Sequence, residues 1–191
     1  MGTIKTTNIE PIANNGTVTL GSSGDTFTVP SGVTVNMSSA TQTGVGGDNT
    51  PAFKAKSASA QDVTEGSNNL VVLGTEVFDT DNAFSSNRFT VPSGEGGKYY
   101  FTAGISSNQA VDTNKTFVVK FHKNGSEILD GFVKIRGVSA NNNPSITTSS
   151  ILVLSAGDYI ELYFYTDNSD TNVQIGGGAN TFMSGYKLIG I

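Results

Sequence analysis

Cysteine and tryptophan are absent from the sequence, and the chain has a single histidine, His122. Without cysteine there is no disulfide and no thiolate metal ligand, and one histidine excludes any site that needs two. No apolar run approaches the ~20 residues that a membrane-spanning helix needs. Charged residues make up only 14% of the chain, the net charge is −5, and the basic residues form no stripe. We therefore expect neither membrane insertion nor binding to a nucleic-acid backbone.

Strong helix formers are also scarce. The 191 residues include only 8 leucines and 6 glutamates, which argues against a helical bundle or coiled coil. Glycine, threonine, serine and asparagine together supply 85 residues. The hydrophobic content of 36%, with 11 phenylalanines and 6 tyrosines, is still enough to form a core. The composition predicts an all-β protein with many turns.

Residues 1–50 differ from the rest of the chain. Apolar residues alternate there in three short stretches, at Val18, Leu20, Phe27, Val29, Val33 and Val35. Strands of three or four residues cannot bury a face alone, so we expect either a shaft that intertwines with identical neighbours or a loose surface arm. Residues 41–50 are polar and rich in glycine, which is typical of a flexible linker. We expect a domain boundary there, with a second domain over residues 51–191.

Longer strands are expected from Pro51 onward. The period-2 alternation and the turn signals predict strands at 52–55, 69–74, 76–78, 98–105, 116–123, 126–130, 131–136, 149–154, 159–165 and 181–191. The dipeptide Asn124-Gly125 is the preferred pair for a two-residue hairpin turn. Eight to ten strands with regular turns predict a β-sandwich.

The predicted strand 159–165 carries large side chains on both of its faces. Ile160, Leu162 and Phe164 alternate with a tyrosine face made of Tyr159, Tyr163 and Tyr165. Two covered faces favour a subunit interface, where tyrosine is enriched. The alternative is that the tyrosines lie singly on the surface.

Little in the sequence indicates catalysis. His122 lies between Lys120 and Lys123 on a predicted hairpin arm, where we expect an exposed side chain rather than a catalytic base. No Gly-x-Ser-x-Gly nucleophile motif occurs. We therefore predict that the protein is not an enzyme, with hydrolysis of a surface polysaccharide as a remote alternative.

Two pairs of aspartates lie in turns rich in asparagine and serine: Asp79 with Asp81, and Asp167 with Asp170. Aspartate in a turn accepts hydrogen bonds from its own backbone and needs no further function. The same carboxylates are the kind of oxygen ligand that Ca²⁺ prefers, although neither pair follows the EF-hand loop. We expect no cofactor, with calcium as the alternative.

Several motifs in residues 51–191 resemble, in their order, the signature of the complement 1q globular head. These are Phe78 with Asn82 and Phe84, Phe89-Thr-Val-Pro92, Gly97-Lys-Tyr-Tyr-Phe101, Gly157-Asp-Tyr-Ile-Glu-Leu162 and Phe182-Met-Ser-Gly-Tyr-Lys-Leu188. The resemblance implies a ten-stranded jelly roll of the complement 1q and tumour necrosis factor class, assembled as a homotrimer. It further implies that a set of aromatic residues divides between the core and the three-fold interface, namely Tyr99, Phe101, Tyr163, Phe182 and Tyr186.

The collagen stalk usual in that family is missing, because no Gly-x-y repeat occurs. Instead, residues 4–9 and 16–32 resemble the N-terminal segments of tailed-bacteriophage fibre and virion proteins. The resemblance implies that residues 1–50 bind capsid or tail proteins. The residues expected to anchor the chain to the particle are Ile4, Ile9, Val18 and Leu20.

Together these features predict a trimeric fibre or spike with a globular knob that attaches to a host-surface glycan or protein. Long polar loops at 106–115, 139–145 and 166–180 suit such contacts, although they are equally compatible with a solvated tip. The alternative is a capsid decoration or cement protein with a purely architectural role. The absence of cysteine and of an apolar signal-peptide core at Met1–Lys5 fits a protein made in a host cytoplasm and displayed on the virion.

Overall fold

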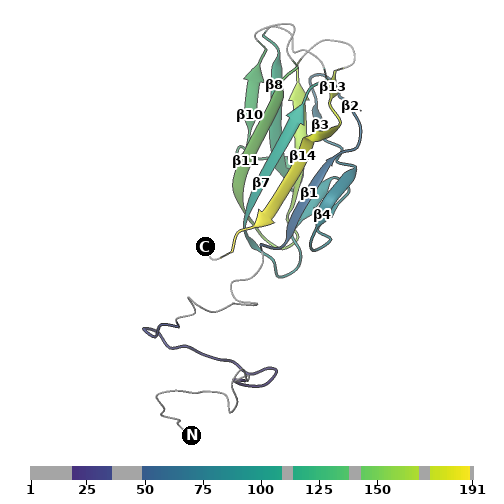
Figure 1. The fold of residues 1–191 in the computed structure, drawn as a ribbon. Helices are drawn as coiled ribbons and strands as arrows, with labels where there is room; N and C mark the ends of the chain where they lie inside the picture. The colour runs from purple at the N-terminus through teal and green to yellow at the C-terminus, as the bar shows by residue number, and fades with distance from the viewer. Residues whose placement is uncertain (1–18, 36–48, 109–113, 138–142, 168–172, 190–191) are drawn as a thin grey trace. The chain divides into compact units, whose positions relative to one another are not determined.

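A computed structural model describes residues 19–35, 49–108, 114–137, 143–167 and 173–189 (Figure 1). The chain divides into two units, Met1–Thr43 and Gly44–Ile191. Among the described residues every regular element is a β-strand, which confirms the prediction of an all-β protein. No helix in these residues is long and apolar enough to cross a membrane.

In the first unit, residues 19–35 form turns and no strand. The Asp25 side chain closes one turn, since its Oδ2 accepts a hydrogen bond from the Ser22 backbone N–H at 2.6 Å. The apolar side chains stay uncovered: Leu20 is 62% exposed and Phe27 is 71% exposed. Short segments become strands only when a second strand pairs with them. Residues 19–35 of one copy therefore form no shaft strand, and a shaft made with neighbouring copies stays a prediction.

The second unit contains two large antiparallel sheets. The first, called the β7 sheet below, has the order β11-β7-β14-β1-β4 (Figure 1). Its strands are β1 (Ala52–Ser57), β4 (Thr75–Asp79), β7 (Gly97–Ser106), β11 (Ser145–Leu154) and β14 (Gly178–Lys187). The chain-end strand β14 therefore lies at the centre of the sheet, between β7 and β1.

The second sheet, called the β8 sheet below, has the order β10-β8-β12-β6-β5, with β3 paired to β12 and β9 paired to β8. Its strands are β3 (Asn68–Leu70), β5 (Phe84–Ser85), β6 (Arg88–Thr90), β8 (Thr116–Lys123), β9 (Ser126–Glu127), β10 (Val133–Arg136) and β12 (Tyr159–Thr166). A small ladder joins β2 (Gln61–Asp62) to β13 (Gln174–Ile175).

The core lies between the two large sheets and is rich in aromatic rings. Phe53 of β1 is fully buried and stacks on Phe89 with ring centroids 4.8 Å apart and on Phe84 at 5.1 Å. Phe101 of β7 approaches Phe53 at 6.3 Å and Phe121 of β8 at 6.1 Å. Because these residues come from both sheets, their burial holds the sandwich together. The predicted β-sandwich is confirmed.

Two turns at one end of the sandwich are tied together by Asp158. Its Oδ2 accepts a hydrogen bond from the Ser155 backbone N–H at 2.8 Å and lies 2.8 Å from Lys123 Nζ. Its Oδ1 accepts a hydrogen bond from the Asn124 side chain at 2.7 Å. Asn124 and Gly125 have φ angles of 53° and 79°, as expected for the predicted hairpin turn. The Lys123 and Asn124 hydrogen bonds lower the pKa of Asp158 to about 2.

Candidate assembly surface

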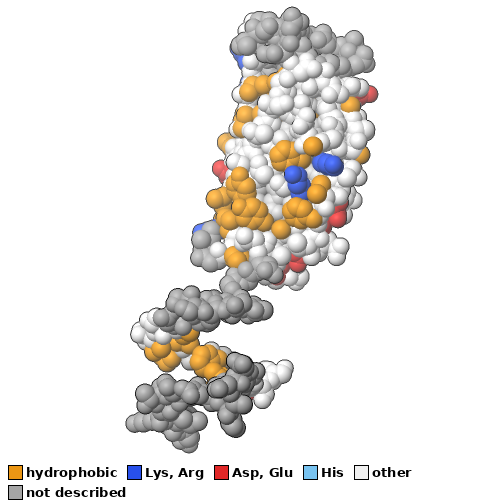
Figure 2. All heavy atoms as spheres, in the orientation of Figure 1, with side chains coloured by type: hydrophobic (Ala, Val, Ile, Leu, Met, Phe, Trp, Pro, Cys, Tyr) orange, Lys and Arg blue, Asp and Glu red, His pale blue; other side chains and the backbone are white. Residues whose placement is uncertain are grey.

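The outer face of the β7 sheet carries apolar and aromatic side chains among polar ones. Residues directly opposite each other on paired strands share a face, and the strand register sets three rows across the sheet. The rows are Ile151–Tyr100–Tyr186–Ala52, then Ser149–Thr102–Ser184–Lys54–Phe78, and then Thr147–Gly104–Phe182–Lys56–Thr75. Figure 2 shows orange side chains gathered over these strands with basic side chains among them.

Aromatic residues on this face are held in place by their neighbours. The rings of Tyr100 and Tyr186 lie 5.6 Å apart, on adjacent strands. Phe182 packs closely against Gly104: a Cβ at Gly104 would come within 2.6 Å of the Phe182 ring. Lys54 places its Nζ 5.3 Å from the centroid of the same ring, a distance at which a cation and an aromatic face attract each other.

The apolar side chains of this face remain open to solvent in the single chain. Ile151 is 59% exposed, Val153 is 72% exposed and Phe78 is 47% exposed. Exposed apolar side chains that gather on one face mark an interaction site. The outer face of the β7 sheet is therefore the candidate functional site.

Unpaired lysines and a hollow complete this face. Lys54, Lys56 and Lys98 make no ion pair with any described residue, whereas Lys120, Lys123 and Lys187 each do. A depression of about 550 Å³ crosses the edge strand β11; it is lined by Tyr100, Thr102, Gly131, Phe132, Val133, Thr147, Thr148 and Ser149. The face thus combines apolar area, uncompensated positive charge and a polar hollow.

The aromatic residues singled out from the sequence fall in three places. Tyr99 and Phe101 are completely buried in the core, and the Tyr99 hydroxyl donates a hydrogen bond to the Glu95 carbonyl at 2.6 Å. Phe182 and Tyr186 lie on the outer face of the β7 sheet, where Tyr186 is 37% exposed. Tyr163 lies on the opposite side of the sandwich, on the β8 sheet. Sequence reasoning missed Tyr100, Ile151, Lys54 and Lys56 as members of the same face.

The residues expected to anchor the chain to a particle are described only in part. Ile4, Ile9 and Val18 lie outside the described residues. Leu20 is described and exposed. Its role in anchoring remains a prediction.

The tyrosine face of β12 is covered by side chains of the same chain. The Arg88 guanidinium lies 4.2 Å from the centroid of the Tyr159 ring, and Lys120 Nζ lies 6.0 Å from that of Tyr165. Tyr163 stacks on His122 with centroids 3.8 Å apart. These contacts within one chain bury the three tyrosines only in part, and their place in a subunit interface stays a prediction.

His122 is buried, and the expectation of an exposed histidine was wrong. Only 6% of the residue is exposed, because Tyr163 covers its ring and the buried Lys120 and Glu161 flank it. Neither ring nitrogen has a hydrogen-bond partner in the described part of the chain. Burial lowers the pKa of His122 and the charge of Lys120 adds to this, while the Gly125 backbone, Glu127 and Glu161 act in the opposite sense.

The aspartates considered as calcium ligands stabilise turns. Asp79 Oδ2 accepts a hydrogen bond from the Phe84 backbone N–H at 2.7 Å, and Asp81 is hydrogen-bonded to the Thr80 hydroxyl. Asp167 accepts a hydrogen bond from the Thr116 backbone N–H, whereas Asp170 lies outside the described residues. Within the described ranges, no three His, Asp or Glu side chains gather as a metal site would require.

Comparison with known proteins places the fold. The structure of murine APRIL at pH 8.5 matches with a TM-score of 0.52 at 13% identity, covering 72% of this chain and 98% of that chain. Eiger TNF from S. frugiperda matches with a TM-score of 0.52 at 12% identity, covering 72% of this chain and 91% of that one. The sandwich has the jelly-roll fold of these two structures. This confirms the predicted fold.

A further match is the globular domain of zebrafish complement 1qA, with a TM-score of 0.48 at 15% identity, covering 72% of this chain and 97% of that chain. Neither a protein-family model nor a curated protein matches the sequence. At these identities the likeness concerns the fold of the sandwich.

Proposed function

We propose that the protein is a non-enzymatic structural subunit of a bacteriophage virion, assembled as a homotrimer. Residues 51–191 form its knob, and residues 1–50 join it to capsid or tail proteins. The observation that carries the proposal is the exposed apolar outer face of the β7 sheet, with Ile151 59% exposed and Tyr186 37% exposed. Covering such a face with further copies removes the apolar area from water.

A closed ring of subunits suits this face better than a two-fold dimer. In a two-fold interface the same patch meets itself, so the unpaired lysines of both copies would be brought into one interface. Like charges brought together at an interface disfavour association. In a closed ring each patch meets a different surface of the next copy, which avoids the repulsion.

The arm supports the same proposal independently. Leu20, Phe27 and Val33 are each more than half exposed in the single chain. Three copies that start from a common knob bring three such arms together at high local concentration. Pairing between them would supply the strands that one copy does not form.

The function we favour is attachment of the particle to a host surface. Three weak sites on one rigid trimer raise avidity by about 10²- to 10⁴-fold without new contacts. The long polar loops of the knob are the segments proposed to make these contacts with a glycan or protein. Capsid decoration is the second candidate, and it requires no ligand besides neighbouring subunits.

Sedimentation of the full chain tests the assembly. We expect a species of about three times the 19.9 kDa chain mass. Replacing Ile151 by aspartate places a charge in the buried interface and should shift the protein toward monomer, while the matched variant Val72→Asp should sediment as the wild type. Val72 is similarly open, at 46% exposed, but lies outside the β7 sheet. A wild-type chain that sediments at 19.9 kDa at all concentrations overturns the proposal.

Two further measurements separate attachment from decoration. Immunolabelling of phage particles locates the protein, and binding of the purified trimer to host cells tests recognition. Binding to cells supports attachment, whereas incorporation into capsids without cell binding supports decoration. Deleting residues 1–40 should abolish incorporation, and retained incorporation contradicts the role of the arm.

A further inference from the structure

A closed ring of subunits needs a second surface that fits the outer face of the β7 sheet. This inference rests on the proposed trimer and asks which part of the next copy covers that face. The occupant must carry apolar side chains to cover Phe182 and Tyr186, and negative charge to compensate Lys54 and Lys56. A turn outside this sheet combines both.

That segment is the turn Leu129–Phe132, between β9 and β10. Leu129 is 83% exposed and Phe132 is 37% exposed, and Asp130 between them is also exposed. The Phe132 backbone N–H donates a hydrogen bond to the Leu129 carbonyl at 3.2 Å, which closes the turn. The turn thus presents a carboxylate with one apolar side chain before it in the sequence and one after it.

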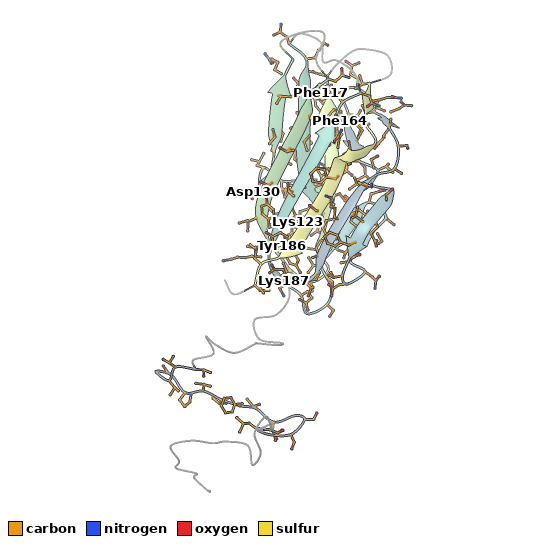
Figure 3. All side chains as sticks on the ribbon, in the orientation of Figure 1. Phe117, Lys123, Asp130, Phe164, Tyr186 and Lys187 are labelled. Atoms are coloured by element: carbon orange, nitrogen blue, oxygen red, sulfur yellow. The ribbon has the colours of Figure 1, made fainter. Side chains whose placement is uncertain are left out.

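The turn is firmly attached to the sandwich. The Thr148 hydroxyl of β11 donates a hydrogen bond to the Gly131 carbonyl at 2.6 Å. Gly131 has a φ of 82°, and a Cβ there would lie 2.6 Å from the Phe121 ring, so glycine lets the backbone press against the core. Figure 3 shows Asp130 at the margin of the sandwich beside β11. A fixed turn loses little conformational freedom when it docks.

Charge distinguishes this turn from the rest of the described surface. Asp130 makes no ion pair or hydrogen bond with any described residue, whereas Glu95, Glu127, Asp158 and Glu161 are each paired with a cation. Glu65 and Glu76 also lack such partners. Glu76, however, lies on β4 of the same sheet as the lysines, and Glu65 has no large exposed apolar side chain beside it.

The turn and the lysines also lie toward opposite edges of the sandwich. The turn adjoins β11, which is one edge of the β7 sheet, and Lys54 and Lys56 lie on β1, next to the other edge strand β4. A subunit with two different complementary patches, here at opposite edges of one face, can associate head to tail and close a ring.

We propose that the Leu129–Phe132 turn of each copy docks on the outer face of the β7 sheet of the next copy, with Asp130 paired to Lys54 and Lys56. Leu129 and Phe132 cover the aromatic side chains around these lysines. The occupant of the exposed face is thus a second copy of this chain, through one named turn.

Charge reversal in the full chain tests the pairing. Asp130→Lys and the double variant Lys54→Glu/Lys56→Glu should each weaken trimer formation by about tenfold or more in a dilution series followed by sedimentation, since like charges then meet at the interface. Combining all three changes should restore association. Glu65→Lys, a matched reversal of an exposed carboxylate elsewhere, should have no effect. Far-UV circular dichroism checks that every variant stays folded.

Disulfide cross-linking gives a second readout. Because the sequence contains no cysteine, any disulfide must come from the introduced residues. The double variant Asp130→Cys/Lys56→Cys should give covalently linked chains on a non-reducing gel. A disulfide requires Cα atoms about 4.4–6.8 Å apart, so the link forms only if the two positions meet across the interface. Each single variant alone should give no linked chains. If the wild type is a trimer but charge reversal does not weaken it and no cross-link forms, the docking proposal is wrong while the proposed trimer stands. A monomeric wild type overturns the proposed assembly itself.

Discussion

Replacing Asp158 by asparagine tests how the two end turns of the sandwich are stabilised. The carboxylate bridges the β8–β9 hairpin turn and the β11–β12 turn, through Asn124, Lys123 and the Ser155 backbone. Asparagine keeps the shape of the side chain but removes its charge. The change therefore separates the electrostatic part of the contact from its packing.

The magnitude follows from the pKa of Asp158, which falls from its ordinary 3.8 to about 2 on folding. One unit of pKa corresponds to about 1.4 kcal/mol, which sets an upper bound of about 2.5 kcal/mol. Lys123 is 32% exposed and the Asp158 side chain 16% exposed, so solvent screening reduces the contribution to about 1–2 kcal/mol. We expect the variant to lose this much stability at pH 7.

The sign of the pH dependence gives a second check. Because folding lowers the pKa, the contribution is fully present above about pH 4 and is lost as the pH falls toward 2. The free energies of unfolding of the wild type and the variant should therefore converge at acid pH. Urea unfolding followed by circular dichroism measures both, at one fixed protein concentration because assembly adds to stability.

Glu65→Gln is the matched control for Asp158→Asn. It removes an exposed carboxylate that has no ion pair or hydrogen bond among the described residues, and surface changes of this kind stay within about 0.5 kcal/mol. Equal stabilities of wild type and Asp158→Asn at pH 7 would refute the reasoning. A difference that persists unchanged down to the lowest pH at which both fold would show that the contact is not electrostatic.

Three further predictions concern the core, the buried histidine and the outer face. Phe53→Ala removes a fully buried ring stacked on two others and should cost about 3–5 kcal/mol in urea unfolding; a loss below 1 kcal/mol contradicts the packing. Burial lowers the pKa of His122 in the folded state, so the unfolded chain takes up the proton first and the wild type loses stability as the pH falls below 6.5. His122→Phe should abolish this loss. If the free energy of unfolding changes equally between pH 8 and pH 5 in both proteins, the prediction is wrong. Gly104→Ala should force the Phe182 ring off the sheet, which weakens association about tenfold while changing unfolding of the isolated chain by less than about 1 kcal/mol. Unaltered sedimentation on dilution would show that the close packing of this ring on Gly104 is irrelevant to assembly.

Local patterns predicted the strands well. The alternation of Phe117, Val119 and Phe121 marks the core face of β8, and Asn124-Gly125 marks the hairpin turn that follows. Strand ends were less accurate: β11 begins at Ser145 rather than near residue 149, and β14 ends at Lys187 rather than at the chain end. Strand ends depend on where a neighbouring strand stops pairing, which a local pattern does not contain.

The surroundings of polar residues were harder to predict. His122 was expected to be exposed because lysines flank it in the sequence, yet Tyr163, 41 positions further on, covers its ring. Likewise, Lys54 and Lys56 look like ordinary solvated residues of a strand. Only their place beside Phe182 and Ser184 of β14 puts them on the same face as the exposed apolar side chains.

The sequence by itself determined that this chain is all-β, because helix formers are few and apolar residues alternate with a period of two. It also determined the jelly-roll class, through motifs spaced along residues 51–191. Only the tertiary structure decided which surface is left uncovered. Alternation separates the two faces of a strand but does not say what lies against each. Side chains of the same chain cover the charged face of β8, whereas apolar side chains on the outer face of the β7 sheet, such as Ile151 and Val153 of β11, stay exposed. That difference depends on which distant strands become neighbours, and such pairing is a property of the whole fold.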